Sequence, residues 1–112
     1  GSMVGDINEI VLRDRENLAQ EGLVIVTVAV DDKAHKIASD PVVVCKGLII
    51  SDSLDNVLEK VGELTSDIVN VALEKDNIDW SEVKNDLHDR ISKRLYGITK
   101  KNPIVMPTII HI

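Results

Sequence analysis

The sequence predicts an α+β (α/β) fold, in which a small mixed sheet of three to four strands is packed on one face by two long helices, with a short N-terminal helix. Residues 22–31 form an apolar run rich in β-branched side chains, which favours a strand. Residues 54–75 and 79–101 repeat apolar side chains at three- and four-residue steps, which is typical of amphipathic helices. Strands therefore come first, two helices follow and a last strand ends the chain, so we expect a mixed sheet.

One domain is expected, because 112 residues are enough for one aliphatic core. The first three residues look like an expression scar; we assign residues 1–5 to that scar and a linker remnant, and residues 6–112 to the domain. Cys45 is the single cysteine, which excludes an internal disulfide and suits a reducing compartment. No apolar run reaches the roughly 18 residues that a spanning helix needs. We therefore expect a cytoplasmic protein that has no membrane partner.

A short helix is predicted between Asp6 and Glu21, with two possible starts. Asp6 and Glu9 have the spacing of a capping box, whereas Asp14 is a second candidate N-cap, which we prefer. Gly22 tolerates the left-handed conformation that follows many helices, so we place the C-cap there.

Residues 22–31 are predicted to be the central strand of the sheet. Alternate side chains of a strand point to opposite faces. The first set is Leu23, Ile25, Thr27 and Ala29, and the second is Val24, Val26, Val28 and Val30. Both sets are mostly apolar, so both faces of the sheet need cover.

Two further strands are predicted over residues 34–39 and 42–50, separated by Asp40 and Pro41. Gly47 inside the second of them marks a bulge or a close backbone approach. The last strand is predicted over 104–112.

Pro107 cannot donate a hydrogen bond within a sheet, so that point of the last strand lies at an edge or at a break.

The two long helices have recognisable ends. Ser51 or Ser53 caps the first, Asp79 with Glu82 forms a capping box for the second, and Pro103 ends it. The apolar stripe of the first is Leu54, Val57, Leu58, Val61, Leu64, Ile68, Val71 and Ala72. That of the second is Trp80, Val83, Leu87, Ile91, Leu95 and Ile98.

Charge is unevenly distributed along a chain of net charge −6. Residues 51–82 contain nine acidic and two basic residues, whereas residues 83–101 contain two acidic and six basic ones. A uniformly acidic chain would bind nucleic acid poorly, but this basic segment keeps nucleic-acid binding possible. Its candidate phosphate contacts are Arg90, Lys93, Arg94, Lys100 and Lys101. The alternative, which we prefer, is that these cations complement their own helix dipole and the acidic helix beside it.

No metal site is predicted. His35, His88 and His111 fall on different elements, and none has a His or Asp two to four positions away in a ligand pattern. Asp89 adjoins His88, but neighbouring helix positions point to different sides.

Two other candidate groups have simpler interpretations. Cys45 lies in an apolar strand, where a thiol usually fills the core. Asp31 and Asp32 read as turn formers rather than as a catalytic carboxylate pair.

Two separated blocks of the sequence resemble the C-terminal domain of ribonuclease J. The first block is Gly5-Asp6-Ile7, Ile10-Val11-Leu12-Arg13-Asp14-Arg15, Leu18 and Glu21-Gly22-Leu23-Val24-Ile25-Val26. The second is Trp80-Ser81-Glu82-Val83-Lys84, Leu95-Tyr96, Thr99-Lys100 and Pro103-Ile104-Val105-Met106-Pro107. The similarity extends over nearly all of residues 5–112.

The resemblance implies a larger parent enzyme that degrades and matures RNA by 5′-to-3′ exonucleolytic and by endonucleolytic cleavage. It implies zinc in an N-terminal metallo-β-lactamase domain with an inserted β-CASP domain, and no cofactor in this C-terminal module. The implied partners are those two domains, a second copy or a paralogous subunit, and RNA through the parent. Arg13 and Arg15, on either side of Asp14, would then contact RNA phosphate or the catalytic domain; otherwise they are solvated residues beside an N-cap.

The predicted function of this chain is therefore non-catalytic assembly or oligomerisation. Two helices can cover one sheet face, and the remaining apolar face would then need a partner. The residues assigned to this self-association face are Val24, Val26, Val28, Val105 and Ile109. The alternative function is a single-stranded RNA-binding module that uses the basic stretch from Arg90 to Lys101.

Overall fold

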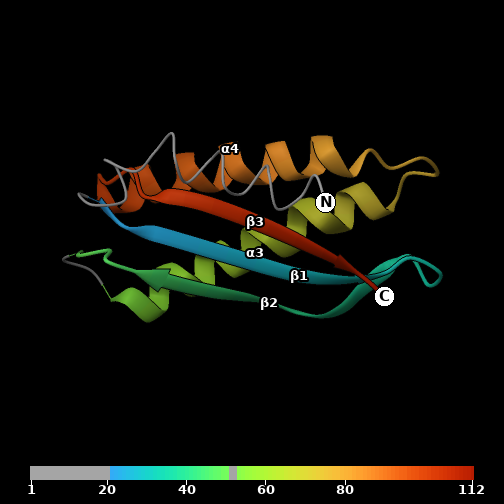
Figure 1. Ribbon diagram of the computed structural model, residues 1–112, viewed down its shortest axis with the longest axis horizontal. Helices are drawn as coiled ribbons and strands as arrows, with labels where there is room; N and C mark the ends of the chain where they lie inside the picture. Colours follow the sequence, from blue (N-terminus) through green and yellow to red (C-terminus); the bar gives the residue numbers. More distant parts are fainter. Residues whose placement is uncertain (1–20, 51–52) are drawn as a thin grey trace, which may run out of the picture.

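A three-stranded sheet lies in front of two helices in the computed structural model, which describes residues 21–50 and 53–112 (Figure 1). The elements are β1 (Leu23–Asp31), β2 (Lys36–Lys46), α3 (Leu54–Leu73), α4 (Trp80–Thr99) and β3 (Ile104–His111). The helix α3 runs behind the strands, and α4 returns in the opposite direction (Figure 1). This arrangement confirms the predicted α+β class.

The strand β1 is central, as predicted, because the sheet order is β2-β1-β3. The pairing of β1 with β2 is antiparallel, and that of β1 with β3 is parallel. The parallel pairing follows from the connection between β2 and β3. The two helices that form it return the chain to the N-terminal end of β1, where β3 begins. Pro107 lies in β3, which is an edge strand, as its missing N–H requires.

The second and third predicted strands, 34–39 and 42–50, are one bulged strand. Asp40 and Pro41 do not interrupt β2; instead the register with β1 shifts at this point. Proline is tolerated there because β2 is the other edge of the sheet. The strand ends before Gly47, where the backbone turns to a φ of +71°.

The core lies between the sheet and the helices. Val24, Val26, Val28 and Val30 are at most 1% exposed, whereas the alternate side chains of β1 are half-buried. The residues of β3 and the helices in this cluster are Val105, Ile109, Val57, Val61, Leu64, Ile68, Val69, Leu73, Leu87, Ile91 and Leu95.

The prediction therefore assigned self-association to the wrong face of the sheet. The residues assigned to it, Val24, Val26, Val28, Val105 and Ile109, are at most 6% exposed and pack beneath the helices. Both faces of β1 are apolar, so alternation alone could not tell which one the helices cover. Within residues 21–50 and 53–112, the helices cover the uniformly Val-lined face, and no helix covers the face that includes Thr27 and Ala29.

The helix α3 begins after Ser53, one of the two predicted N-caps. Its buried surface is broader than the predicted stripe, because α3 contacts both the sheet and α4. Thr65 and Val69 are fully buried, and the Thr65 hydroxyl donates to the carbonyl oxygen of Val61 at 2.8 Å. Val71, which the pattern assigned to the core, is 59% exposed.

The helix α4 begins after Asp79, as predicted. The Asp79 carboxylate accepts hydrogen bonds from the N–H groups of Ser81 at 3.1 Å and Glu82 at 3.2 Å. The helix ends at Thr99, and Lys100 follows with a φ of +60°. Leu87, Ile91 and Leu95 are buried, which confirms the middle of the predicted stripe.

Replacing Asp79 with alanine is expected to lower the free energy of unfolding by about 1 kcal/mol, because two backbone N–H groups lose their acceptor. Urea denaturation followed by circular dichroism measures the loss. The matched control is Asp67→Ala on the exposed side of α3, for which we expect no loss. Equal stability of the Asp79→Ala variant and the unsubstituted chain would contradict the capping role.

Several sequence predictions lie outside the described residues. These are the scar at 1–5, the N-terminal helix apart from Glu21, the Ser51 cap, and Arg13 and Arg15.

Candidate functional site

The face of the sheet that points away from α3 and α4 is the first candidate surface, here called the open sheet face. It carries the alternate side chains of β1 and their cross-strand partners. Its residues are Leu23, Ile25, Thr27 and Ala29 of β1, Ser39, Val42, Val44 and Lys46 of β2, and Ile104, Met106, Thr108 and Ile110 of β3, among which Ile104 is only 4% exposed.

The open sheet face is apolar at its centre. Val44, Ile25 and Met106 pair across the three strands and form one continuous apolar row. Val42 and Val44 are 59% and 51% exposed, and Ile110 is 46% exposed. Among the described elements, both helices pack on the opposite side of the sheet (Figure 1). This face therefore carries apolar side chains that neither α3 nor α4 covers, and its residues differ from those first assigned.

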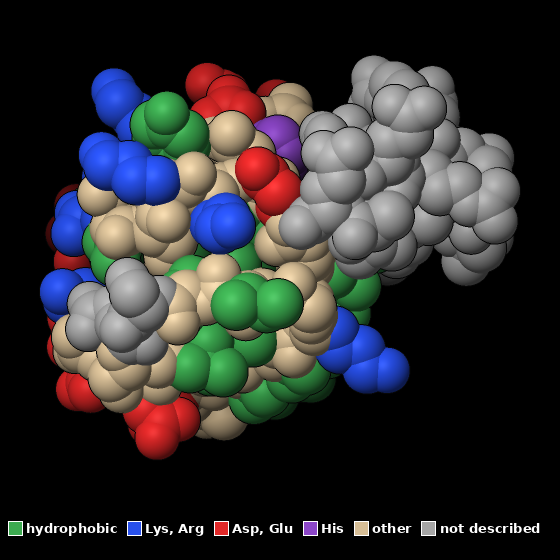
Figure 2. All heavy atoms as spheres, turned by 90° about the vertical axis from the view of Figure 1, so that its left-hand side faces the viewer, with side chains coloured by type: hydrophobic (Ala, Val, Ile, Leu, Met, Phe, Trp, Pro, Cys, Tyr) green, Lys and Arg blue, Asp and Glu red, His purple; other side chains and the backbone are tan. Residues whose placement is uncertain are grey.

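The predicted basic stretch is divided by the structure. Arg90, Lys93 and Arg94 line one groove together with Leu64, Gly97 and Ile98, here called the basic groove. Figure 2 shows Lys and Arg side chains gathered along the upper left edge of the molecule.

The two remaining lysines make other contacts. Lys100 Nζ lies 5.6 Å from the centre of the Tyr96 ring. The Lys101 N–H donates to the Thr99 hydroxyl oxygen at 3.1 Å. The structure therefore brings together three of the five predicted cations in the basic groove. Lys100 and Lys101 do not line it.

A second groove continues along the same two helices toward the start of α4. Its carboxylates are Asp79, Glu82, Asp86 and Asp89, against one cation, Lys75, and its apolar lining includes Ile68, Val71 and Ala72. We call it the acidic groove. Arg90 Nη1 lies 3.5 Å from Asp86 Oδ2 where the acidic and basic grooves meet, but both side chains are about half exposed, so this ion pair adds little stability.

A third groove lies between β2 and α3, here called the strand-side groove. Its four carboxylates are Asp40, Asp55, Glu59 and Glu63, and Gly62 and Pro41 line it as well. Acidic side chains alone do not define a ligand site, and we assign it none.

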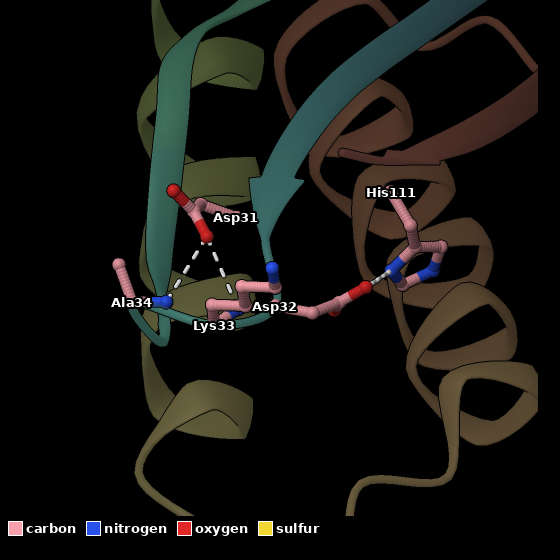
Figure 3. A network of polar contacts seen from close by, with 5 residues as sticks. All are labelled: Asp31, Asp32, Lys33, Ala34 and His111. Atoms are coloured by element: carbon pink, nitrogen blue, oxygen red, sulfur yellow. Dashed lines mark hydrogen bonds and ion pairs between the residues drawn. The ribbon is translucent and has the colours of Figure 1, made fainter.

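The turn between β1 and β2 carries a polar network that joins three strand ends (Figure 3). Asp31 Oδ1 accepts hydrogen bonds from the N–H groups of Lys33 at 3.1 Å and Ala34 at 3.0 Å. Its neighbour Asp32 points the other way, and its Oδ1 lies 2.9 Å from His111 Nδ1. Asp31 thus forms the turn, as predicted, and the two carboxylates are not a pair.

The contact between Asp32 and His111 was not foreseen from the sequence. The sequence could not predict this contact without the parallel pairing of β3 with β1. That pairing brings the C-terminal ends of the two strands together. The His111 ring also packs edge-on against Trp80 at 4.9 Å between ring centres. The network fastens the end of the edge strand β3 to the turn and to the start of α4.

The other histidines are accounted for individually. His35 Nδ1 lies 3.1 Å from the carbonyl oxygen of Leu73. His88 Nδ1 lies 3.0 Å from Asp89 Oδ1, so the prediction that these neighbours point apart is wrong. Within residues 21–50 and 53–112, no three His, Cys, Asp or Glu side chains are grouped so that they could hold a metal ion.

Cys45 faces the core from β2 and is half-buried against it. In the part of the chain that the structure describes, no helix is long and apolar enough to cross a membrane.

Comparison with known proteins identifies relatives of the whole chain. The family model of the ribonuclease J C-terminal domain matches residues 10–112. Ribonuclease J 2 of Staphylococcus aureus (strain NCTC 8325 / PS 47) is 37% identical over 112 residues, which are 100% of this chain and 20% of that protein. Ribonuclease J 2 of Staphylococcus saprophyticus is 38% identical, with the same coverage. The chain thus spans about a fifth of the length of these curated relatives.

Proposed function

Because the chain belongs to the ribonuclease J C-terminal domain family, we propose that it is the non-catalytic assembly domain of a ribonuclease J-type enzyme, and that two copies associate through the open sheet face. In this proposal the parent cleaves RNA by 5′-to-3′ exonucleolytic and by endonucleolytic hydrolysis. The zinc belongs to the parent's metallo-β-lactamase domain, and this chain contributes no metal ligand. Its own β-lactamase and β-CASP domains and a paralogous subunit are the other proposed partners.

The observation that supports the proposal is the apolar row across the open sheet face, in which Val44 is exposed and Ile25 and Met106 are half-buried. Val44 of the edge strand β2 is 51% exposed, it pairs with Ile25 of the central strand, and Ile25 pairs in turn with Met106 of β3. Contiguous apolar surface of this kind on a folded protein commonly marks a protein interface. Burying each square ångström of it against a second copy contributes roughly 25 cal/mol.

The edges of the sheet favour association through its face rather than through strand addition. Pro41 lies in the edge strand β2, and Pro107 lies in the edge strand β3. A proline in an edge strand removes a backbone donor and discourages pairing with another chain. Two sheets stacked face to face need only interdigitate their side chains, at a separation of about 10 Å.

Replacing Val44 with lysine is expected to abolish this association, because the ammonium group would be buried without a partner at the centre of the interface. The measurement is light scattering at about 1 M NaCl, where contacts between surface charges are screened. We expect the unsubstituted chain to approach twice 12.3 kDa as its concentration rises, and the Val44→Lys variant to stay at 12.3 kDa.

The control for this experiment is Ile49→Lys, because Ile49 is 82% exposed and lies outside the open sheet face. It should associate like the unsubstituted chain. Circular dichroism verifies that both variants remain folded. Two results would contradict the proposal: an unsubstituted chain that is monomeric at every concentration in 1 M salt, or a Val44→Lys variant that associates as strongly.

A further inference from the structure

The helix layer, on the opposite side of the molecule from the open sheet face, has two oppositely charged halves. Glu82, Asp86, Arg90, Lys93 and Gly97 recur along α4 at steps of three and four residues, so they form one stripe. The first two line the acidic groove and the last three line the basic groove. The change of sign falls near the middle of a helix that is about 30 Å long.

Such a stripe is complementary to a reversed copy of itself. A two-fold axis through the middle of α4 places the acidic half of one copy on the basic half of the other, and does so twice. Two-fold interfaces of this kind are closed, because each copy uses the same surface. From this geometry we propose that the outer face of α3 and α4 is a second contact surface for another copy of this chain, with the two α4 helices antiparallel.

Apolar groups within the two grooves would support the contact. Val71 is 59% exposed on the floor of the acidic groove, although the helix pattern places it among core residues. Ile98 lines the basic groove and is half-buried, whereas Leu64 beneath it is only 9% exposed and belongs to the core. Apolar surface surrounded by charges of both signs is the composition of a protein interface, with a central apolar region and a polar rim.

Gly97 gives an independent reason to expect a close partner at the basic groove. It lies inside α4 and is exposed, and a Cβ atom added to it would meet no atom of residues 21–50 or 53–112 within 4 Å. Alanine is a better helix former than glycine, so the contacts among the described residues of one copy offer no reason for glycine here. A glycine allows another molecule to approach the helix backbone closely.

A second copy fits these observations better than RNA does. The acidic groove adjoins the basic groove on the same stripe, so a polyanion that follows α4 would meet Asp86, Glu82 and Asp79. Lys100 and Lys101 do not line the basic groove, which leaves three cations for phosphate. The net charge of −6 also opposes the approach of a polyanion.

The test uses the 112-residue chain with Val44→Lys already in place, so that the open sheet face is disabled. The acid-to-base set is Glu82→Lys, Asp86→Lys and Asp89→Lys. The base-to-acid set is Arg90→Glu, Lys93→Glu and Arg94→Glu. The control set is Asp55→Lys, Glu59→Lys and Glu63→Lys. It changes the net charge by the same amount as the acid-to-base set, but in the strand-side groove.

At about 0.1 M NaCl, the Val44→Lys chain is expected to associate, and this association should disappear at about 1 M, where the screening length falls from about 10 Å to about 3 Å. Each of the two reversed sets should raise the dissociation constant about tenfold or more. A 1:1 mixture of the two sets should recover the association, because each then meets an opposite charge. The control set should leave it unchanged.

Three results would overturn the inference. The first is a Val44→Lys chain that is monomeric at 0.1 M salt, which leaves the open sheet face as the proposed interface. The second is an equal loss with the control set, which would make the effect one of net charge. The third is a base-to-acid set that abolishes binding of a single-stranded oligouridine without changing the molecular mass, which would assign the basic groove to RNA. A different pair of results would support the helix surface and contradict the open sheet face. In that case the reversed sets abolish association at 0.1 M salt, and Val44→Lys leaves the molecular mass in 1 M salt unchanged.

Discussion

Replacing Gly22 with alanine is expected to lower the free energy of unfolding by about 3 kcal/mol. Gly22 has a φ of +99°, where an L-residue is strained, and its Cβ would lie 2.7 Å from the carbonyl oxygen of Lys46 and 2.8 Å from Leu48 N. Strain at positive φ costs about 1–2 kcal/mol, and overpacking against a backbone that cannot move adds about 1–3 kcal/mol. Urea denaturation at several concentrations measures the change.

The position of Gly22 explains why the effect should spread through the sheet. Its carbonyl oxygen accepts a hydrogen bond from the Ile104 N–H at 2.9 Å, so the start of β3 is attached to the same residue that the end of β2 contacts. The matched control is Gly97→Ala, which should raise the free energy of unfolding by up to about 1 kcal/mol, because no atom of the described part of the chain opposes the added methyl group. Losses of equal size at both glycines would contradict this explanation.

Replacing Ile91 with alanine is expected to lower the free energy of unfolding by about 2–5 kcal/mol. Ile91 is completely buried in the middle of α4, within the cluster that joins both helices to the sheet. The loss combines the transfer free energy of the deleted methyl and methylene groups with the cost of the cavity that they leave. Urea denaturation followed by circular dichroism measures this loss.

The control for the core substitution is Ile49→Ala. Ile49 is 82% exposed, so the same truncation should change the free energy of unfolding by no more than about 0.5 kcal/mol. A loss at Ile91 that is no larger than the loss at Ile49 would mean that the helices are not held to the sheet by this cluster.

Local patterns in the sequence predicted most of the secondary structure. The capping side chain of Asp79 and the stripe of Leu87, Ile91 and Leu95 located α4, because capping and helical periodicity depend on residues a few positions apart. The same reasoning divided β2 at Pro41, because the sequence does not show that this proline lies in an edge strand that can bulge.

The sequence predicted the chemical type of the candidate surfaces but not which residues form them. The sequence indicated an excess of apolar strand surface, and the structure has exposed apolar side chains at Val42, Val44 and Ile110. It did not indicate the side: the assigned Val26 is 1% exposed, whereas Val44 is 51% exposed. The basic stretch was found by counting charges, but its division between the basic groove and the contact of Lys100 with Tyr96 depends on how α4 is rotated against α3.

The sequence alone thus determined the two long helices, the central place of β1, the last strand β3 and the family to which the chain belongs. These depend on local periodicity, capping and turn chemistry, and on residue patterns shared with relatives. The tertiary structure decided which apolar face of β1 is covered, and it brought Asp32 to His111. It also placed Arg90, Lys93 and Arg94 beside a row of carboxylates. The physical reason is that packing chooses between two apolar faces by the joint fit of all the elements, which no local stretch of residues encodes.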